Sequence, residues 1–286
     1  MDPVIARKTW RTVEPLHGIV YFAPEGDAAF AKVGLDAGRM GYFASRSAPM
    51  GAVAADVVIA TFFNFNPDVV RRVIPRAWTL ASPAAVTHAR LAAADAVMRR
   101  ALGKAVESAE VDEAATLARR AAEAACEHPQ GRPLFAGHAS LPWPEPSHLV
   151  LWHAQTLLRE FRGDGHVAAL CIEELEGIDA LVIHAATGEI PAEVLQQTRG
   201  WPDGTWATAI DRMRARGFVE PDEPLRLTEA GQTHRQWVED RTDALAVRAY
   251  EPLGEEGCAR LRALVRPLSR AVVDSGFLSP VATVEP

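Results

Sequence analysis

The sequence predicts an all-α fold with one small β-hairpin, built from duplicated helical units. The 286 residues are rich in alanine, leucine, arginine and glutamate, and only 7% are aromatic, a composition that favours helices. Apolar residues recur at helical spacing along most of the chain. A segment near the front is repeated in the middle, and such repeats are typical of architectures in which one unit occurs twice.

The repeat relates two segments that are 131 residues apart, Glu14-Pro15-Leu16-His17 and Glu145-Pro146-Ser147-His148. We therefore predict a first, wingless helical repeat over 1–140 and a second repeat over 141–286. Equivalent helices of related units often meet across a twofold axis, so we expect the two units to pack as an intramolecular pseudo-dimer. Further matched pairs are Tyr21 with Trp152, Phe30 with Phe161, Gly51 with Gly177, Pro67 with Pro191, and Trp78 with Trp201.

Capping and breaking residues place the individual elements. Asn66-Pro67 and Ser82-Pro83 are typical helix starts, because the first residue caps and the proline occupies the first turn. Gly163 and Gly165 flank Asp164 and predict a corner between two helices. In the second unit we expect helices at 146–162, 164–176, 178–187, 191–198 and 203–216, a hairpin at 217–228, and long helices at 228–248 and 254–276.

Charge and cysteine content bound the functional classes. The formal net charge is −7 and the pI about 5.7, which argues against an extended nucleic-acid-binding face. The three cysteines are scattered and form no C-x-x-C pair, as expected for reduced thiols in a cytoplasmic protein. No apolar run reaches about 18 residues, so no membrane span is expected.

The C-terminal third carries a family resemblance. Ile190–Leu195 resembles the first helix of a helix-turn-helix, Gly204–Gly217 resembles its recognition helix, and Leu225–Gly231 resembles the second wing strand and the start of the next helix. Together, residues 190–273 resemble a MarR-type winged helix, and the whole chain is similar to an actinobacterial family with a helix-turn-helix-like C-terminal region. The resemblance implies a winged helix in the second unit and makes DNA binding a hypothesis.

The tip of the expected wing departs from that pattern. Its sequence is Glu220-Pro221-Asp222-Glu223-Pro224, which would repel phosphate, whereas DNA-binding wings usually carry arginines that enter the minor groove. The recognition-like helix keeps Arg212, Arg214 and Arg216, which either contact DNA or form a solvated face. DNA binding is therefore possible in principle but disfavoured by the acidic wing and the charge.

Asp164 and His166 form the densest polar cluster with their neighbours. Asp164 caps the following helix in one interpretation, and in another it forms an acid–base pair with His166. His166 is alternatively a metal ligand. No established metal-binding or dinucleotide-binding motif is present, so the sequence assigns no metal and no cofactor.

The helix after Pro146 supplies a candidate ligand-binding stripe. His148, Trp152 and Arg159 fall at i, i+4 and i+11 and share one helical face, and His17 and Tyr21 form the matching stripe in the first unit. A single cavity between the units is expected, which Asp164 and His166 would close at one end. The remaining ligand-binding candidate is His184, which either faces that site or is a hydrogen-bonded core residue.

Three functions follow from these observations. The first is a small-molecule-binding protein on a duplicated MarR-like scaffold, with an apolar, aromatic or anionic ligand in the cleft between the repeats and a regulatory role left open. The second is an enzyme that uses histidine and aspartate for acid–base or metal chemistry in the same cleft. The third is a DNA-binding transcriptional regulator. The sequence assigns no oligomeric state.

Overall fold

The all-α prediction is confirmed. The computed structural model describes residues 1–276, and its strand-like pairing there is a single antiparallel bridge between Val219 and Leu227. The helices in chain order are α1 (Pro3–Gly18), α2 (Pro24–Lys32), α3 (Arg39–Ser47), α4 (Ala55–Phe62), α5 (Pro67–Arg71), α6 (Arg76–Leu80), α7 (Pro83–Leu102), α8 (Ala109–Cys126), α9 (Pro133–Ala139), α10 (Ser147–Ile172), α11 (Gly177–Ala185), α12 (Ala192–Arg199), α13 (Asp203–Ala215), α14 (Glu229–Tyr250) and α15 (Gly254–Asp274).

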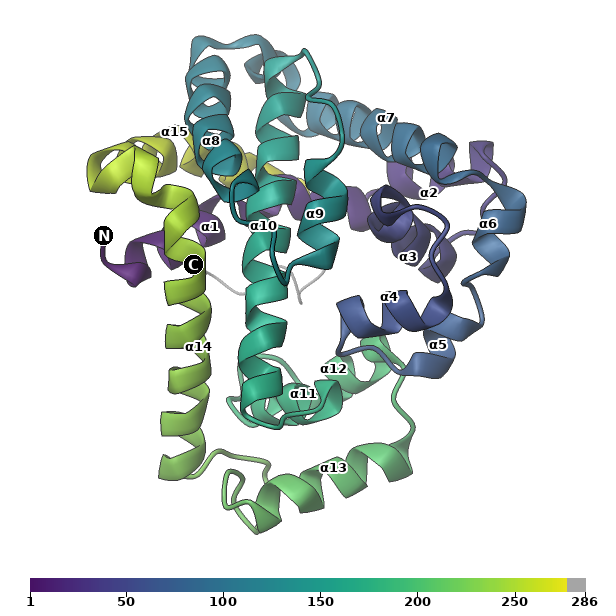
Figure 1. The fold of residues 1–286 in the computed structure, drawn as a ribbon, viewed down its shortest axis with the longest axis vertical. Coiled ribbons are helices and arrows are strands. Elements are labelled where there is room, and N and C mark those ends of the chain that lie inside the picture. The colour runs from purple at the N-terminus through teal and green to yellow at the C-terminus, as the bar shows by residue number, and fades with distance from the viewer. Residues whose placement is uncertain (277–286) are drawn as a thin grey trace.

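The 26-residue helix α10 runs through the middle of the molecule (Figure 1). It packs against α1, α8 and α14, and side chains all around it are buried, as expected for a central helix. The predicted corner at Gly163 and Gly165 is wrong, because α10 continues through both residues. Gly165 instead permits close packing: a Cβ there would lie 2.8 Å from Nη1 of Arg132 and 3.4 Å from Cβ of Leu245.

The largest apolar core joins the front and the back of the chain. It combines side chains of α1, α7 and α8 with side chains of α10, α14 and α15, including Leu16, Val97, Leu157 and Leu264. A second core holds α3 to α7 together, and a third lies within α11 to α14 around Trp206. No helix within residues 1–276 combines the length and the apolarity needed to cross a bilayer.

The structure does not show the predicted duplication. The middle segment of the repeat lies in one uninterrupted helix, α10, whereas the front segment is divided among the end of α1, a 3-10 turn and α2. Pro24 accounts for part of the difference, because it begins α2, whereas the matching residue of the middle segment, Gln155, lies inside α10.

The predicted β-hairpin is likewise not formed beyond the Val219–Leu227 bridge. Two backbone hydrogen bonds flank that bridge, from Glu220 N to Arg226 O at 2.9 Å and from Thr228 N to Phe218 O at 3.1 Å. The tip between them contains two prolines, which have no N–H to donate to a ladder. The segment expected as a wing is therefore a short loop closed by one bridge.

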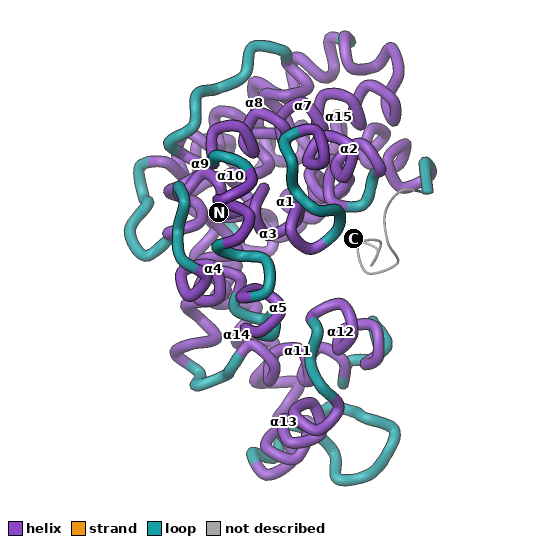
Figure 2. Tube along the Cα trace, turned by 90° about the vertical axis from the view of Figure 1, so that its right-hand side faces the viewer, coloured by secondary structure: helices purple, strands orange, loops and turns teal. Residues whose placement is uncertain are grey.

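Helices α11, α12 and α13 form a small lobe at one end of the molecule (Figure 2). Val182, Leu195, Trp206 and Met213 belong to its apolar core. Helix α14 connects the lobe to the main body. Arg39 of α3 donates to the backbone oxygens of Gln197 and Thr198, at 3.0 and 3.1 Å, so the C-terminal end of α12 is tied to the body.

Candidate functional site

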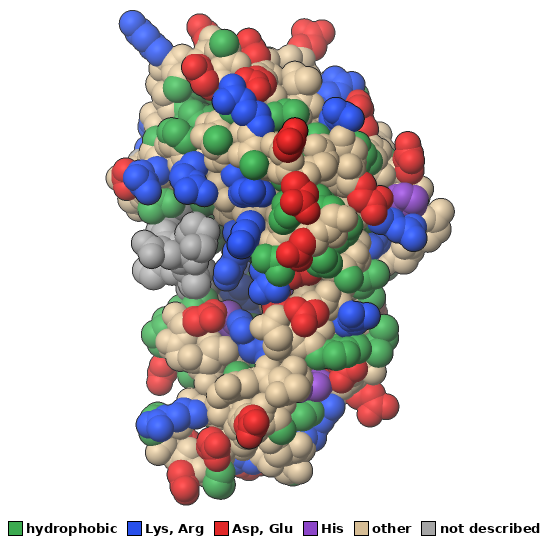
Figure 3. Space-filling model, turned by 90° about the vertical axis from the view of Figure 1, so that its left-hand side faces the viewer, with side chains coloured by type: hydrophobic (Ala, Val, Ile, Leu, Met, Phe, Trp, Pro, Cys, Tyr) green, Lys and Arg blue, Asp and Glu red, His purple; other side chains and the backbone are tan. Residues whose placement is uncertain are grey.

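A cavity of about 1600 Å³ opens beside the attachment of the lobe. Its walls come from α1, α2, α3, the C-terminal end of α12, and α15, with Arg159 of α10 at the inner wall. Lys and Arg side chains gather around a hollow on the corresponding face of the molecule (Figure 3). The cavity therefore brings together the α11–α13 lobe, the first helix α1 and the last helix α15.

The lining is strongly positive, although the chain as a whole carries a net charge of −7. Among the described residues, nine Lys or Arg and three Asp or Glu side chains line the cavity, an excess of six positive charges. A recessed surface of one charge sign concentrates ions of the opposite sign. The basic residues are Arg7, Lys8, Arg11, Arg39, Arg159, Arg199, Arg262, Arg266 and Arg270, and the acidic ones are Glu14, Asp27 and Asp274.

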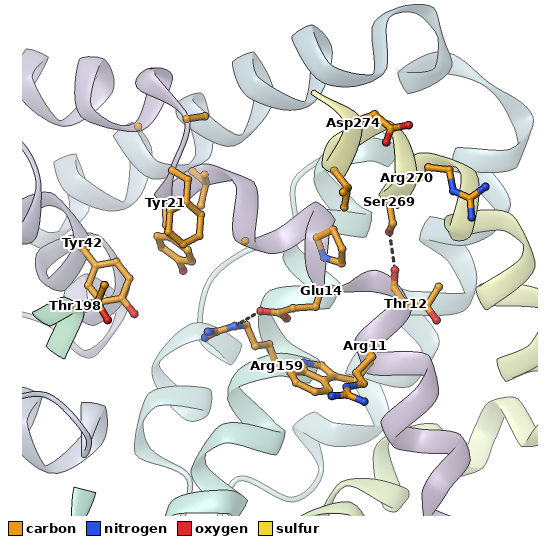
Figure 4. Close-up of a pocket in the computed structure, with 18 of the residues that line it drawn as sticks. Arg11, Thr12, Glu14, Tyr21, Tyr42, Arg159, Thr198, Ser269, Arg270 and Asp274 are labelled. Atoms are coloured by element: carbon orange, nitrogen blue, oxygen red, sulfur yellow. Dashed lines mark hydrogen bonds and ion pairs between the residues drawn. The ribbon is translucent and has the colours of Figure 1, made fainter. Parts of the chain in front are cut away.

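A buried ionic network lies behind the inner wall and reaches the cavity through Glu14 and Arg159. The Arg46 guanidinium donates to both carboxylate oxygens of Glu160, at 2.8 and 2.9 Å, and Arg159 donates to Glu160 at 3.1 Å. Arg159 also donates to Glu14, at 2.7 Å (Figure 4). Burial alone would raise the pKa of the Glu160 carboxyl, but the two guanidinium groups lower it to about 2. Glu160 is therefore ionised at any physiological pH and holds both arginines in place.

Aromatic rings cover the wall beside this network. The rings of Tyr21 and Tyr42 meet edge to face at 5.2 Å, and the Tyr42 hydroxyl accepts a hydrogen bond from Arg46 at 2.7 Å. Burial would raise the pKa of the Tyr42 phenol, but the surrounding guanidinium groups, those of Arg46, Arg159 and Arg199, lower it below its usual value. The potential at this wall is therefore positive as well.

His17 lies behind Tyr21 in a hydrogen-bonded chain. Thr156 donates its hydroxyl proton to Trp152 O at 3.1 Å, so its oxygen accepts from Nδ1–H of His17 at 3.0 Å. Nε2 of His17 then accepts from the Tyr21 hydroxyl at 3.2 Å, and that hydroxyl accepts from Arg90 at 2.9 Å. Burial, followed by repulsion from nearby arginines, keeps the pKa of His17 well below its ordinary value, so the imidazole is neutral.

Three buried polar atoms of the lining have no hydrogen-bond partner in the described part of the chain. They are Nε1 of Trp10, Nε of Arg199 and Oε2 of Glu14. Buried polar groups are almost always paired, so each of these atoms carries an unmet hydrogen-bonding capacity. The atoms themselves are buried, and a ligand would meet other atoms of the same residues at the cavity wall.

The sequence-predicted site residues separate into groups. His17, Tyr21, Trp152 and Arg159 come together: the His17 and Trp152 rings stack at 5.9 Å, Tyr21 and Arg159 line the cavity, and the other two lie behind it. His148 lies apart, at the start of α10, where its Nε2 is 2.6 Å from a carboxylate oxygen of Asp95.

Asp164 faces away from the cavity towards α9. Its carboxylate accepts from the Phe135 backbone N–H at 2.9 Å, in the first turn of α9, so it caps that helix rather than a helix of its own corner. Burial raises the pKa of this carboxyl to about 6, although the Phe135 hydrogen bond opposes the shift. Asp164 and His166 share no hydrogen bond and face different neighbours.

His166 and His184 line a separate, smaller pocket of about 360 Å³ between α10, α11 and α14. Nδ1 of His166 lies 2.9 Å from the hydroxyl of Thr242, which itself donates to a backbone carbonyl, so this nitrogen donates. Burial lowers the pKa of both imidazoles below their usual value. Within residues 1–276, no group of three or more His, Cys, Asp or Glu side chains is placed to hold a metal ion.

The arginines at the end of α13 are all engaged locally. Arg212 pairs with Asp179 at 2.6 Å, Arg214 pairs with Glu223 at 3.0 Å, and Arg216 donates to two backbone carbonyls. The fully exposed positions of α13 carry no basic side chain. These positions are Asp203, Gly204, Thr205, Ala207, Thr208, Asp211 and Ala215.

Several residues of the site were missed by the sequence analysis. Arg46 and Glu160 are 114 positions apart, and no local pattern joins them. The spacing of Arg262, Arg266 and Arg270 at i, i+4 and i+8 was a readable signal of one basic helix face. Arg199 was not predicted, because nothing local marks the end of α12 as the side of a cavity.

The architecture and this site define an all-α protein with a small lobe formed by α11, α12 and α13 and a basic cavity beside it. The sequence profile of a helix-turn-helix family matches residues 6–279, so the chain belongs to that family. No curated protein and no solved structure matches the chain at a significant level.

Proposed function

We propose that this helix-turn-helix family member is a small-molecule-binding protein whose ligand is an anionic aromatic compound held in the 1600 Å³ cavity. The reversal of charge carries the proposal: a chain of net charge −7 lines this one cavity with an excess of six positive charges. Arg7, Arg39 and Arg159 have structural partners, but selection for folding or solubility alone gives no reason to gather the other six basic side chains there. A ligand of opposite charge does.

The chemistry of the walls supports the same class of ligand. Arginine guanidinium groups bind carboxylates and phosphates through paired hydrogen bonds. Arg199 lines the cavity and has no acidic partner in the described chain, and its guanidinium donates only to the neutral hydroxyl of Thr198, at 3.0 Å, so its charge is not balanced by a carboxylate. Tyr21, Tyr42 and Phe65 line the cavity next to it and offer ring faces and edges to an aromatic ligand.

The MarR-type winged helix and the pseudo-dimer remain part of this proposal. The order α12, α13, bridge and α14 is the order of a winged helix. The two long helices α7 and α8 are joined by a 3-10 turn, Gly103–Glu107, and α14 and α15 are joined by another, Glu251–Leu253. This recurrence supports two related units, each ending in a pair of long helices.

The enzyme and regulator alternatives have less support. Acid–base catalysis near neutral pH needs a titrating group at the ligand, whereas His17 is buried and neutral behind Tyr21, and Asp164 and His166 face elsewhere. Family membership favours DNA binding, but the exposed positions of α13 and the wing tip carry acidic rather than basic side chains. The cavity is therefore the better-supported functional surface.

A matched pair of probes tests the proposal by calorimetric titration. The flat aromatic anion 2-naphthoate should bind, and its neutral amide, 2-naphthamide, should bind at least about tenfold more weakly, because an ion-assisted hydrogen bond contributes roughly 1.5–3 kcal/mol. Arg199→Gln should remove most of the difference, and Arg120→Gln, on the exposed face of α8 outside the cavity, should preserve it. Equal affinity for the two probes, or no binding of either, would refute an anionic ligand.

A further inference from the structure

The basic residues of the cavity fall into two groups on opposite sides. Arg39, Arg159 and Arg199 lie on the α3, α10 and α12 side, next to the tyrosines. Arg262, Arg266 and Arg270 lie on α15, faced by Lys8 and Arg11 of α1. Figure 4 shows Tyr42 and Thr198 at one side of the cavity, Glu14 and Arg159 in the middle, and Ser269 and Arg270 of α15 at the other.

The α15 group forms a regular row. Residues four apart lie on one face of a helix, about 6 Å from one another along its axis. Arg262, Arg266 and Arg270 therefore present adjacent guanidinium groups to the cavity over roughly two turns. Ser269 fixes α15 against α1, because its buried hydroxyl donates to Thr12 O at 2.6 Å.

In the described chain, the arginines of this row have no acidic partner, whereas an arginine on the other face of α15 does. Arg260 of α15 points away from the cavity and makes two hydrogen bonds to Glu113, at 2.6 and 2.7 Å. In the described part of the chain, Arg266 and Arg270 have no carboxylate partner, and Arg262 donates only to the hydroxyl of Thr9. The row is thus positively charged and available, which is the condition for binding a multiply charged anion.

We propose that the α15 row is a phosphate subsite, so that the ligand is a phosphate ester whose aromatic part packs against the Tyr21–Tyr42 wall. This inference rests on the proposed function and specifies the ligand class within it. A carboxylate carries one negative charge and is satisfied by the Arg199 side alone. A phosphate ester carries up to two negative charges and has three acceptor oxygens. Two adjacent guanidinium groups of the row can contact these oxygens.

A small ligand suits this surface better than a nucleic acid backbone. The row faces a cavity that is closed on its far side by α2, α3 and the end of α12. The rest of the molecule carries the excess negative charge that makes the total −7, which repels a long polyanion outside the cavity. A compact phosphate ester meets only the positive lining.

The test compares 2-naphthyl phosphate with 2-naphthoate by calorimetry at fixed ionic strength. The wild-type protein should bind the phosphate about tenfold more tightly, the gain of one additional ion-assisted hydrogen bond. The double variant Arg266→Gln/Arg270→Gln should lose that advantage while its affinity for 2-naphthoate changes by less than about twofold. The control variant Arg120→Gln/Arg226→Gln removes the same charge at exposed positions outside the cavity and should retain the advantage.

The outcomes separate this inference from the function on which it rests. If 2-naphthoate binds and 2-naphthamide does not, but the phosphate has no advantage or keeps it in Arg266→Gln/Arg270→Gln, the cavity binds anions and the phosphate subsite is wrong. If neither naphthyl anion binds, both proposals are wrong. Displacement of 2-naphthyl phosphate by a 12-nucleotide single-stranded DNA at equal phosphate concentration would assign the row to nucleic acid and also overturn the subsite.

Discussion

The arginines of α13 and α15 differ in whether they have partners within the protein. Arg212, Arg214 and Arg216, at and just after the end of α13, are bound to carboxylates and carbonyls. The three arginines that line the cavity on α15 have no acidic partner in the described chain. The difference arises from their neighbours: α13 ends beside Glu176, Asp179 and the acidic loop 220–224, and the α15 row faces a cavity. Availability of an arginine, rather than its presence, therefore separates a structural from a binding surface.

The buried network below the cavity provides the strongest test of that distinction. Glu160→Gln should destabilise the protein by about 3–5 kcal/mol, because it leaves the guanidinium of Arg46 buried without a counter-charge. Urea unfolding at pH 7 measures the loss. Glu113→Gln removes an exposed carboxylate that pairs with Arg260 and should leave the urea midpoint nearly unchanged. A small loss for Glu160→Gln would mean that paired arginines are not structural here.

The pH dependence of the same variant sharpens the test. The pKa of Glu160 is lowered from 4.5 to about 2 in the folded protein, mainly by Arg46 acting against burial. Its stabilisation is therefore fully present above about pH 4.5 and is lost as the pH falls towards 2. The urea midpoints of wild type and Glu160→Gln should converge across that window. A constant gap down to pH 2 would exclude the ionised carboxylate as the cause.

Asp164 has no direct basic partner, so its ionisation should affect stability in the opposite direction to that of Glu160. Burial raises the pKa of Asp164 to about 6, and the nearby Arg132 donates to the carbonyls of Phe161 and Leu245 instead. Ionisation of Asp164 therefore disfavours the folded state as the pH rises from about 4 to 6. Asp164→Asn keeps an oxygen that can accept from the Phe135 N–H.

Asp164→Asn should accordingly raise the free energy of unfolding by about 2 kcal/mol at pH 8 and change it little at pH 4. Paired urea titrations at the two pH values measure both effects. His88→Gln, at an exposed position of α7, serves as the control and should show no difference between the two conditions. Destabilisation at pH 8 would show that the ionised form of Asp164 contributes to the fold.

The helical architecture was predictable because its signals are local. Asn66 and Ser82 cap the helices that were expected from them, and Thr228 caps α14. Glycine was misread at Gly163 and Gly165, because a small residue allows close helix packing as well as a turn. The repeat predicted the same helix boundaries in both segments, but Pro24 begins a new helix in the front segment, and the matching residue of the middle segment, Gln155, lies inside α10.

The site could be predicted only in part. Tyr21 and Arg159 were expected at a ligand site from helical spacing, and both line the cavity. The same spacing placed His148 with them, but His148 lies in the first turn of α10, eleven residues before Arg159, and contacts Asp95 instead. The ion pair of Arg46 with Glu160 depends on the tertiary fold, which sequence patterns of a single chain do not specify.

Single variants compare the contribution of an α13 arginine to stability with that of an α15 arginine. Arg212→Gln should cost about 1 kcal/mol of stability, because it removes the partner of the buried Asp179 carboxylate. Arg266→Gln should leave the urea midpoint unchanged, because Arg266 has no partner in the described chain, and should instead weaken binding of 2-naphthyl phosphate. Equal stability losses would show that the α15 row is also structural.

The smallest effect is expected on DNA affinity when the arginines at the end of α13 are replaced. The exposed positions of α13 include Asp203 and Asp211 and no basic residue, so random duplex DNA should bind more weakly than the 10⁻⁴–10⁻⁶ M that is typical of non-specific binding by DNA-binding proteins. Arg214→Gln/Arg216→Gln should change any residual affinity by less than about twofold, since those guanidinium groups are already occupied. Fluorescence anisotropy at several salt concentrations measures both quantities. Micromolar, strongly salt-dependent binding that is lost in this double variant would make α13 a working recognition helix, and the α13–α15 contrast would then no longer distinguish structural from binding arginines.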